Sequence, residues 1–192
     1  MSAVKRIPLF PLTSHVLPGG QIRLRIFEPR YLRMVKDAMR HGSEIGMCML
    51  DAFGNKENNS HILPLGTLAK IVDFECLPDG LLGITVVGQS LFCIRSIDTE
   101  KDGLRVAEVE ARQNWPQEQL CNEDSLLRHR MEEIYQQHPE LKDLCPEHST
   151  DRTDWLCLRW LEILPLDPSM KQELLDSKDC HKARDYIRNL IL

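Results

Sequence analysis

The chain has 192 residues, of which 42% are hydrophobic and 28% charged, a composition typical of a soluble globular protein. Its formal net charge of -5 argues against a dedicated nucleic-acid binder, because neutralising phosphates requires clustered excess lysine and arginine. No stretch approaches the roughly 20 consecutive apolar residues of a membrane helix, and Pro8 and Pro11 interrupt the apolar start. We therefore expect a cytoplasmic protein without a signal peptide.

The charge is unevenly distributed along the chain. Residues 1–40 contain eight basic and two acidic side chains, whereas the remainder is strongly acidic. One interpretation is that solvated faces of opposite charge attract each other across a domain boundary. The other is a basic patch for an acidic partner.

Seven cysteines are present, and no two of them form a C-x-x-C pair. An odd number without such a pair predicts neither a disulfide framework nor a zinc ribbon. We expect reduced cysteines that are mostly buried as small apolar residues.

Short apolar or alternating runs separated by turn residues predict strands in the first part of the chain. The expected strands are 5–12, 22–26, 44–51, 66–77, 81–87, 90–98 and 104–110. The clearest hairpin turns at Pro78, Asp79 and Gly80, which are residues suited to a tight turn. Strands of this length and spacing favour a closed or nearly closed barrel, because closure removes unpaired edges.

One helix is expected to interrupt the strands. Pro29 suits a first helical position because its missing N–H would be unbonded there, and Gly42 is placed to end the helix. The polar segment 53–60 is predicted to be an exposed loop that carries one aromatic residue, Phe53.

Long stretches with helical periodicity follow Trp115, at 123–138, 151–164, 167–176 and 179–191. Asp167 before Pro168 is typical of a helix start, and Trp155 and Trp160 are expected in the core. The chain is therefore predicted to be α+β, with a barrel and one inserted helix over 1–115 and a helical subdomain over 116–192.

Motifs for catalysis are absent from the sequence. There is no phosphate-binding glycine loop, no dinucleotide fingerprint, no G-x-S-x-G elbow and no H-E-x-x-H. Cys180 and His181 resemble a nucleophile and base, but adjacent helical residues point about 100° apart and do not easily share a hydrogen bond. We expect no catalytic residue, no cofactor and no metal ligand.

Several segments at both ends of the chain resemble the amino-terminal domain of the Lon proteases. These segments are IPLFPL (7–12), VLPGG (16–20), LRIFEPRY (24–31), MV (34–35), LPLGTLA (63–69), LPDG (77–80), GQS (88–90), LPL (164–166) and KQELL (171–175). The resemblance covers nearly the whole chain. It implies a PUA-like β-barrel followed by a helical bundle, and a role in capturing unfolded or tagged polypeptide rather than cutting it.

The resemblance and the charge pattern together suggest where polypeptide binds. The candidate peptide-binding residues are Phe27, Glu28, Arg30, Tyr31 and Phe53, in a concave surface expected where the barrel meets the helices. The same residues also suit a purely structural role, since Glu28 and Arg30 flank a helix start and Tyr31 offers apolar area.

Three function classes remain open at this point. The first is a non-catalytic recognition or adaptor module in protein quality control, whose partners are extended polypeptide and a protease or chaperone. The second is a PUA-like RNA-binding protein that uses the amino-terminal basic residues. The third is an enzyme, which would need a pocket with perturbed titratable groups.

Overall fold

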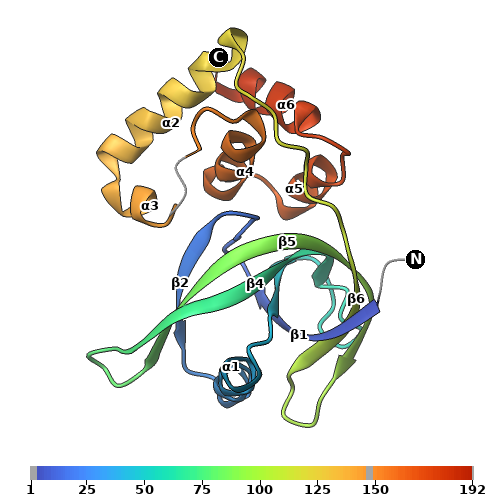
Figure 1. Ribbon diagram of the computed structural model, residues 1–192. Helices are drawn as coiled ribbons and strands as arrows, with labels where there is room; N and C mark the ends of the chain where they lie inside the picture. The colour runs from blue at the N-terminus through green and yellow to red at the C-terminus, as the bar shows by residue number, and fades with distance from the viewer. Residues whose placement is uncertain (1–3, 146–148, 192) are drawn as a thin grey trace. The chain divides into compact units, whose positions relative to one another are not determined.

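The computed structural model describes residues 4–145 and 149–191, which divide into two compact units, 1–113 and 114–192. The first unit contains the strands and one helix, and the second unit contains the remaining helices (Figure 1). The chain is thus α+β, as predicted.

Six strands form one mixed sheet in the first unit. They are β1 (Val4–Leu12), β2 (Gln21–Ile26), β3 (Ile45–Leu50), β4 (Ile62–Cys76), β5 (Leu82–Thr99) and β6 (Arg105–Ala111). β1 and β3 are parallel, and the other pairs are antiparallel. Because the long β5 pairs with β2 and β4 near its start and with β6 near its end, the strands close into a ring. The predicted barrel is confirmed.

The two strands expected at 81–87 and 90–98 are one strand, β5, so this part of the prediction was wrong. Ala69 pairs with Gly88 and Leu68 pairs with Ser90, which leaves Gln89 as an extra residue in a bulge. A bulge breaks the alternation of side chains without ending the strand, and in the sequence it resembles a turn. A Cβ atom at Gly88 would lie 2.3 Å from the Leu17 carbonyl oxygen, so this close approach requires glycine.

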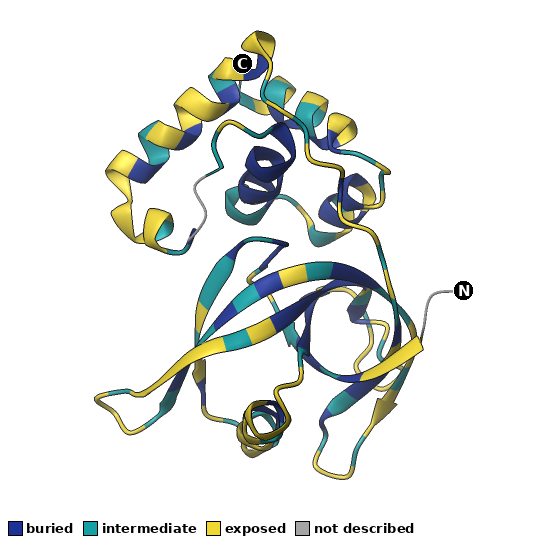
Figure 2. Ribbon diagram, viewed as in Figure 1, coloured by how far each residue is buried: buried dark blue, intermediate teal, exposed yellow. Residues whose placement is uncertain are grey.

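The helix α1 (Pro29–His41) packs on the barrel through Met34, Val35 and Ala38, which are buried in one cluster with barrel side chains. Gly42 ends the helix with a φ of 61°, as the sequence predicted. Figure 2 shows many buried positions along the strands, whereas the tips of the β4–β5 and β5–β6 hairpins are mostly exposed.

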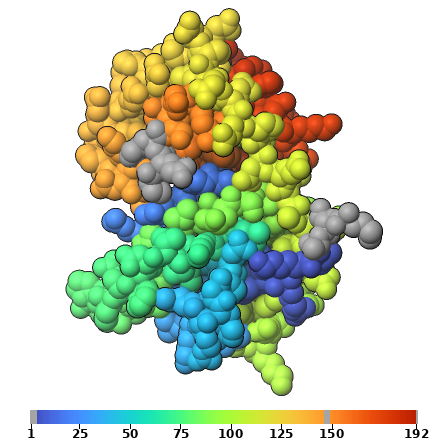
Figure 3. Space-filling model, viewed as in Figure 1, coloured from blue at the N-terminus to red at the C-terminus, as the bar shows by residue number. Residues whose placement is uncertain are grey.

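Several basic residues near the amino terminus pair with acids of the same unit. Arg25 pairs with Asp79 in the β4–β5 hairpin, and Arg33 contacts Glu100 at 2.5 Å and Asp102 at 2.7 Å in the β5–β6 hairpin. Both hairpins stand out from the surface in Figure 3. Much of the uneven charge therefore serves pairing within the barrel unit, a role that neither interpretation of the charge pattern had included.

The described residues of the second unit form a short 3-10 helix and five α-helices. They are η1 (Asn122–Asp124), α2 (Ser125–Gln137), α3 (Pro139–Asp143), α4 (Thr153–Ile163), α5 (Pro168–Leu175) and α6 (His181–Ile191). α3 was not expected from the sequence, because one helix was predicted to end at residue 138 and the next to begin at residue 151. Proline suits the first position of a helix, and Pro139 begins α3.

The helix α4 forms the centre of the second unit. Trp155 and Trp160 are only 3% and 4% exposed, which confirms that they belong to the core. The indole N–H of Trp160 donates to the Leu127 carbonyl oxygen at 3.2 Å and so joins α4 to α2. At the start of α5, Asp167 accepts a hydrogen bond from the Ser169 N–H, as its predicted capping role requires.

All seven cysteines are free, and four of them are buried, in agreement with the expectation from the sequence. Among the helices that the structure describes, none combines the length and the apolar character needed to span a membrane.

Candidate functional site

A pocket of about 300 Å³ opens on the barrel unit where β1 and β2 end and α1 begins. Its apolar lining consists of Phe10, Pro11, Leu12, Ile26, Phe27, Tyr31 and Leu50. Its polar lining consists of Arg25, Glu28, Arg30, Lys56, His61 and Arg105. We call this cavity the barrel pocket. It combines an apolar surface with four basic side chains and one acidic side chain.

The junction between β2 and α1 forms one wall of the barrel pocket. Ile26 is buried at the end of β2, Phe27 is 67% exposed, and Glu28 immediately precedes the helix. The Glu28 carbonyl oxygen accepts hydrogen bonds at 3.0 Å from the N–H groups of Tyr31 and Leu32. The start of α1 also adds positive partial charge from its free N–H groups.

Arg30 is held in place by contacts on both sides of its guanidinium group. Its Nη2 lies 2.7 Å from a Glu28 carboxylate oxygen, and its Nη1 donates to the Gly103 carbonyl oxygen at 2.9 Å. The guanidinium carbon also lies 4.7 Å from the centre of the Tyr31 ring. Arg30 thereby connects α1 to the β5–β6 hairpin and gives the wall a fixed positive charge.

Tyr31 packs against the barrel core beneath Arg30. The centres of the Tyr31 and Phe10 rings are 4.3 Å apart, and the ring planes are tilted by 37°. Burial raises the pKa of Tyr31, although the nearby positive charge of Arg30 opposes this effect. The hydroxyl group is therefore neutral at physiological pH and can take part in hydrogen bonds.

Lys56 and Arg105 supply positive charge, and neither has a carboxylate partner among the described residues. Arg105 donates to the Asn59 side-chain oxygen at 3.2 Å, the Gly103 carbonyl oxygen at 2.9 Å and the Lys56 carbonyl oxygen at 3.5 Å. All three acceptors are neutral. Among the residues that the structure describes, none pairs with the Lys56 ammonium group.

His61 is buried beside these two cations. Burial lowers its pKa, and the positive charges of Arg105 and Lys56 lower the pKa further, against a hydrogen bond with the backbone of Asn55. The imidazole is therefore neutral at pH 7. Its Nδ1 atom is buried and has no hydrogen-bond partner among the described residues.

The structure brings together four of the five residues that the sequence suggested for peptide binding. Phe27, Glu28, Arg30 and Tyr31 line the barrel pocket, whereas Phe53 does not line it and is 94% exposed. Lys56, His61 and Arg105 were missed. They come from the loop before β4 and from β6, and no local sequence signal connects either segment to Arg30.

The barrel pocket is better suited to binding than to covalent catalysis. Its lining contains no serine, threonine or cysteine that could act as a nucleophile. The carboxylate of Glu28 is paired with Arg30, and His61 has no nucleophile beside it in this lining. The pocket therefore offers apolar area, hydrogen-bond donors and positive charge.

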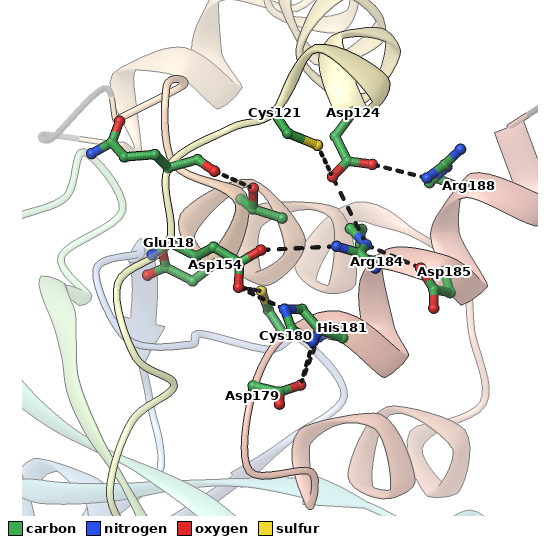
Figure 4. A network of polar contacts seen from close by, with 12 residues as sticks. Glu118, Cys121, Asp124, Asp154, Asp179, Cys180, His181, Arg184, Asp185 and Arg188 are labelled. Atoms are coloured by element: carbon green, nitrogen blue, oxygen red, sulfur yellow. Dashed lines mark hydrogen bonds and ion pairs between the residues drawn. The ribbon is translucent and has the colours of Figure 1, made fainter.

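The helical unit contains three residues that could hold a metal ion, Glu118, Cys180 and His181, which the sequence analysis did not expect. Their ligand atoms lie within 4.8 Å of one another, and this set of oxygen, sulfur and nitrogen donors suits zinc. A Glu118 oxygen lies 2.7 Å from the His181 Nε2 and 3.8 Å from the Cys180 sulfur (Figure 4). Arg184 lies 3.8 Å from the other Glu118 oxygen, so these contacts also join the segment before η1 to α6.

Comparison with known proteins decides the family. Residues 6–191 match the family described as the ATP-dependent protease La (LON) substrate-binding domain. The chain belongs to the Lon substrate-binding domain family. No ATPase or peptidase domain is found in its 192 residues.

Two solved structures are similar to this Lon substrate-binding domain. The crystal structure of a Lon N-terminal domain protein from Xanthomonas campestris is 29% identical with a TM-score of 0.77, and the match covers 98% of this chain and 99% of that one. The N-terminal domain of the Mycobacterium avium complex Lon protease is 14% identical with a TM-score of 0.63, and the match covers 96% and 97%. The second likeness supports the fold alone.

Proposed function

We propose that this Lon substrate-binding domain recognises extended polypeptide in the barrel pocket without cutting it, and that it acts as a recognition or adaptor module in protein quality control. The observation that carries the proposal is a cavity lined by apolar and charged side chains in a chain of a substrate-binding family. Burial of apolar groups is non-directional, so such a surface accepts many unrelated side chains.

The size of the barrel pocket sets the expected affinity. A volume of about 300 Å³ is at the lower end of the range for ligand pockets, and it accommodates one or two side chains of a polypeptide. The rest of the segment would lie on the surface, where contacts contribute little. We therefore expect dissociation constants in the micromolar range or weaker.

The rigidity of one wall favours recognition. The side chains of Phe10, Arg30 and Tyr31 already hold one another, so they lose little conformational freedom when a ligand binds. Phe27 is the exception, because it lines the pocket and remains exposed. Its ring is available to cover an apolar side chain of the bound segment.

The test compares Phe27→Ala with the matched control Phe74→Ala in binding to a reduced, alkylated and fluorescently labelled protein. Phe74 is also exposed, but it lies on β4 outside the pocket lining. We expect Phe27→Ala to weaken binding at least about fivefold, because part of a phenylalanine burial is lost, and Phe74→Ala to leave it unchanged. If both variants bind as tightly as the wild type, polypeptide does not bind in the barrel pocket and the proposal is wrong on this point.

The same assay separates polypeptide recognition from RNA binding. We expect single-stranded RNA not to displace the labelled polypeptide at physiological salt, since the net charge of -5 opposes nucleic acid. Displacement by RNA at lower concentration than by unlabelled polypeptide would favour the RNA-binding alternative. Cross-linking in a native lysate, with Lon present and absent, tests the adaptor role.

A further inference from the structure

The positive charges of the barrel pocket are only partly compensated. Arg25 pairs with Asp79, and Arg30 pairs with Glu28. Lys56 and Arg105 line the same cavity and contact no carboxylate within the described residues, since every acceptor of Arg105 is neutral. We propose that the barrel pocket selects polypeptide segments in which a carboxylate group lies next to an apolar side chain.

The backbone holds two of these cations close together. The Gly103 carbonyl oxygen accepts one hydrogen bond from Arg30 and one from Arg105, both at 2.9 Å. Two guanidinium groups at one carbonyl oxygen repel each other, and the single carboxylate of Glu28 offsets this repulsion only in part. A ligand carboxylate reduces the remaining repulsion and gains charge-assisted hydrogen bonds.

The third cation extends this positive region along the loop before β4. Arg105 reaches the Lys56 carbonyl oxygen, which places the Lys56 backbone beside Arg105, while the Lys56 ammonium group remains without a partner among the described residues. His61, in the same lining, is kept neutral and so does not add to the charge. The attraction for an anion therefore comes mainly from Lys56 and Arg105, because the Glu28 carboxylate compensates the charge of Arg30.

The apolar part of the lining determines what accompanies the carboxylate. Phe10, Ile26 and Leu50 border the same cavity and offer no hydrogen-bonding side chain. A bare anion such as phosphate would leave this surface uncovered, and a purely apolar side chain would leave the cations uncompensated. An apolar side chain beside a carboxylate satisfies both parts of the pocket.

The carboxylate can come from an internal aspartate or glutamate or from the carboxyl terminus of a chain. This inference rests on the proposed function, because it specifies which segments the same pocket prefers. Four fluorescent peptides distinguish the two sources. They share a phenylalanine and differ in an adjacent glutamate or glutamine and in a free or amidated carboxyl terminus.

The experiment measures these peptides by fluorescence anisotropy against the wild type, Lys56→Gln, Lys56→Arg and the control Lys70→Gln. Lys70 is an exposed lysine of β4 outside the pocket lining. We expect the carboxylate peptides to bind about threefold to tenfold more tightly than the matched neutral peptide. Lys56→Gln should remove much of this difference, Lys56→Arg should restore it, and Lys70→Gln should leave it unchanged.

The salt dependence of the peptide preference provides a second measurement, and a variant that had merely unfolded would not show the expected change. Preference for the carboxylate peptides should decrease between 0.05 and 0.5 M NaCl, and Lys56→Gln should make this decrease smaller. If all four peptides bind equally, and Phe27→Ala weakens each of them, the pocket binds polypeptide without charge selection and this inference is wrong. If no peptide responds to Phe27→Ala or Lys56→Gln, the proposed function fails with it.

Discussion

Arg30 and Tyr31 show how one residue can serve both the scaffold and the candidate site. Their side chains line the barrel pocket, yet Arg30 also binds Gly103 and Tyr31 packs on Phe10. From the sequence, these residues suited either a binding role or a purely structural one. Their contacts predict that Arg30→Glu and Tyr31→Ala lower the stability of the fold. Phe27 and Lys56 are therefore better probes of binding.

The buried environment of Lys171 predicts how the free energy of unfolding changes with pH. It is 2% exposed in α5, and burial lowers its pKa from 10.5 to about 8, although nearby Glu162 opposes this effect. Between these two pH values the unfolded chain binds a proton that the folded chain lacks. The free energy of unfolding should therefore rise with pH across this window, and the destabilisation should be complete below about pH 8.

Lys171→Met tests this expectation, since methionine keeps the length of the side chain and removes the buried charge. Urea unfolding of both proteins at several pH values from 7 to 10.5 would be measured. We expect the variant to be more stable at pH 7, by up to about 3 kcal/mol, and the difference to shrink as the pH rises. A difference that stays constant with pH would show that folding does not lower the pKa of Lys171.

At the scale of elements, α4 organises the helical unit and the long β5 organises the barrel. Every residue from Thr153 to Leu161 is buried, so α4 is covered on all sides along this stretch. β5 pairs with β2, β4 and β6, and this is possible because the bulge at Gln89 lets one strand continue around the ring.

The tryptophans of α4 give a prediction at this scale. Replacing Trp155 or Trp160 with alanine should lower the free energy of unfolding by about 3 to 5 kcal/mol, because each change leaves a large cavity. Trp160→Ala also leaves the Leu127 carbonyl oxygen without the indole N–H. Chemical denaturation measures the change, and Phe74→Ala is the exposed aromatic control. A loss below about 1 kcal/mol would contradict burial in the core.

For the whole molecule, the proposed function is recognition of polypeptide. The family that matches the chain is a family of substrate-binding domains. The sequence contains none of the motifs for phosphate binding or peptide hydrolysis that we sought. The barrel pocket adds apolar area and positive charge without a nucleophile. Partners are thus expected to be polypeptides held reversibly.

The matching prediction is that the purified chain neither hydrolyses ATP nor cleaves casein. A coupled assay for phosphate release and gel analysis of casein would both be run against a buffer blank. Trace activity should disappear on repurification, because it would come from contaminating enzymes. Casein cleavage that persists through repurification and is abolished by a substitution in this chain would overturn the prediction.

Local signals determined much of the secondary structure from the sequence alone. Pro29, Gly42, Gly80 and Asp167 act through their own backbone or that of residues a few positions away. Their roles could therefore be predicted without tertiary structure. The Lon resemblance likewise predicted the order of a barrel followed by helices, because its motifs occur near both ends of the chain.

Only the tertiary structure decided what lines the barrel pocket. Closure of the ring brings the loop before β4 and the start of β6 to the end of β2. Arg105 therefore meets Arg30 at the Gly103 carbonyl oxygen, and Lys56 lines the same pocket. These residues lie far apart in the sequence and come together only through the register of paired strands. No periodicity or spacing in the sequence predicts their proximity. Tertiary contacts also made β5 one continuous strand at Gln89 and brought Glu118 to Cys180 and His181. Which basic side chains have a carboxylate partner is decided only in the folded chain. The proposed preference for carboxylates depends on those basic side chains of the pocket that have none.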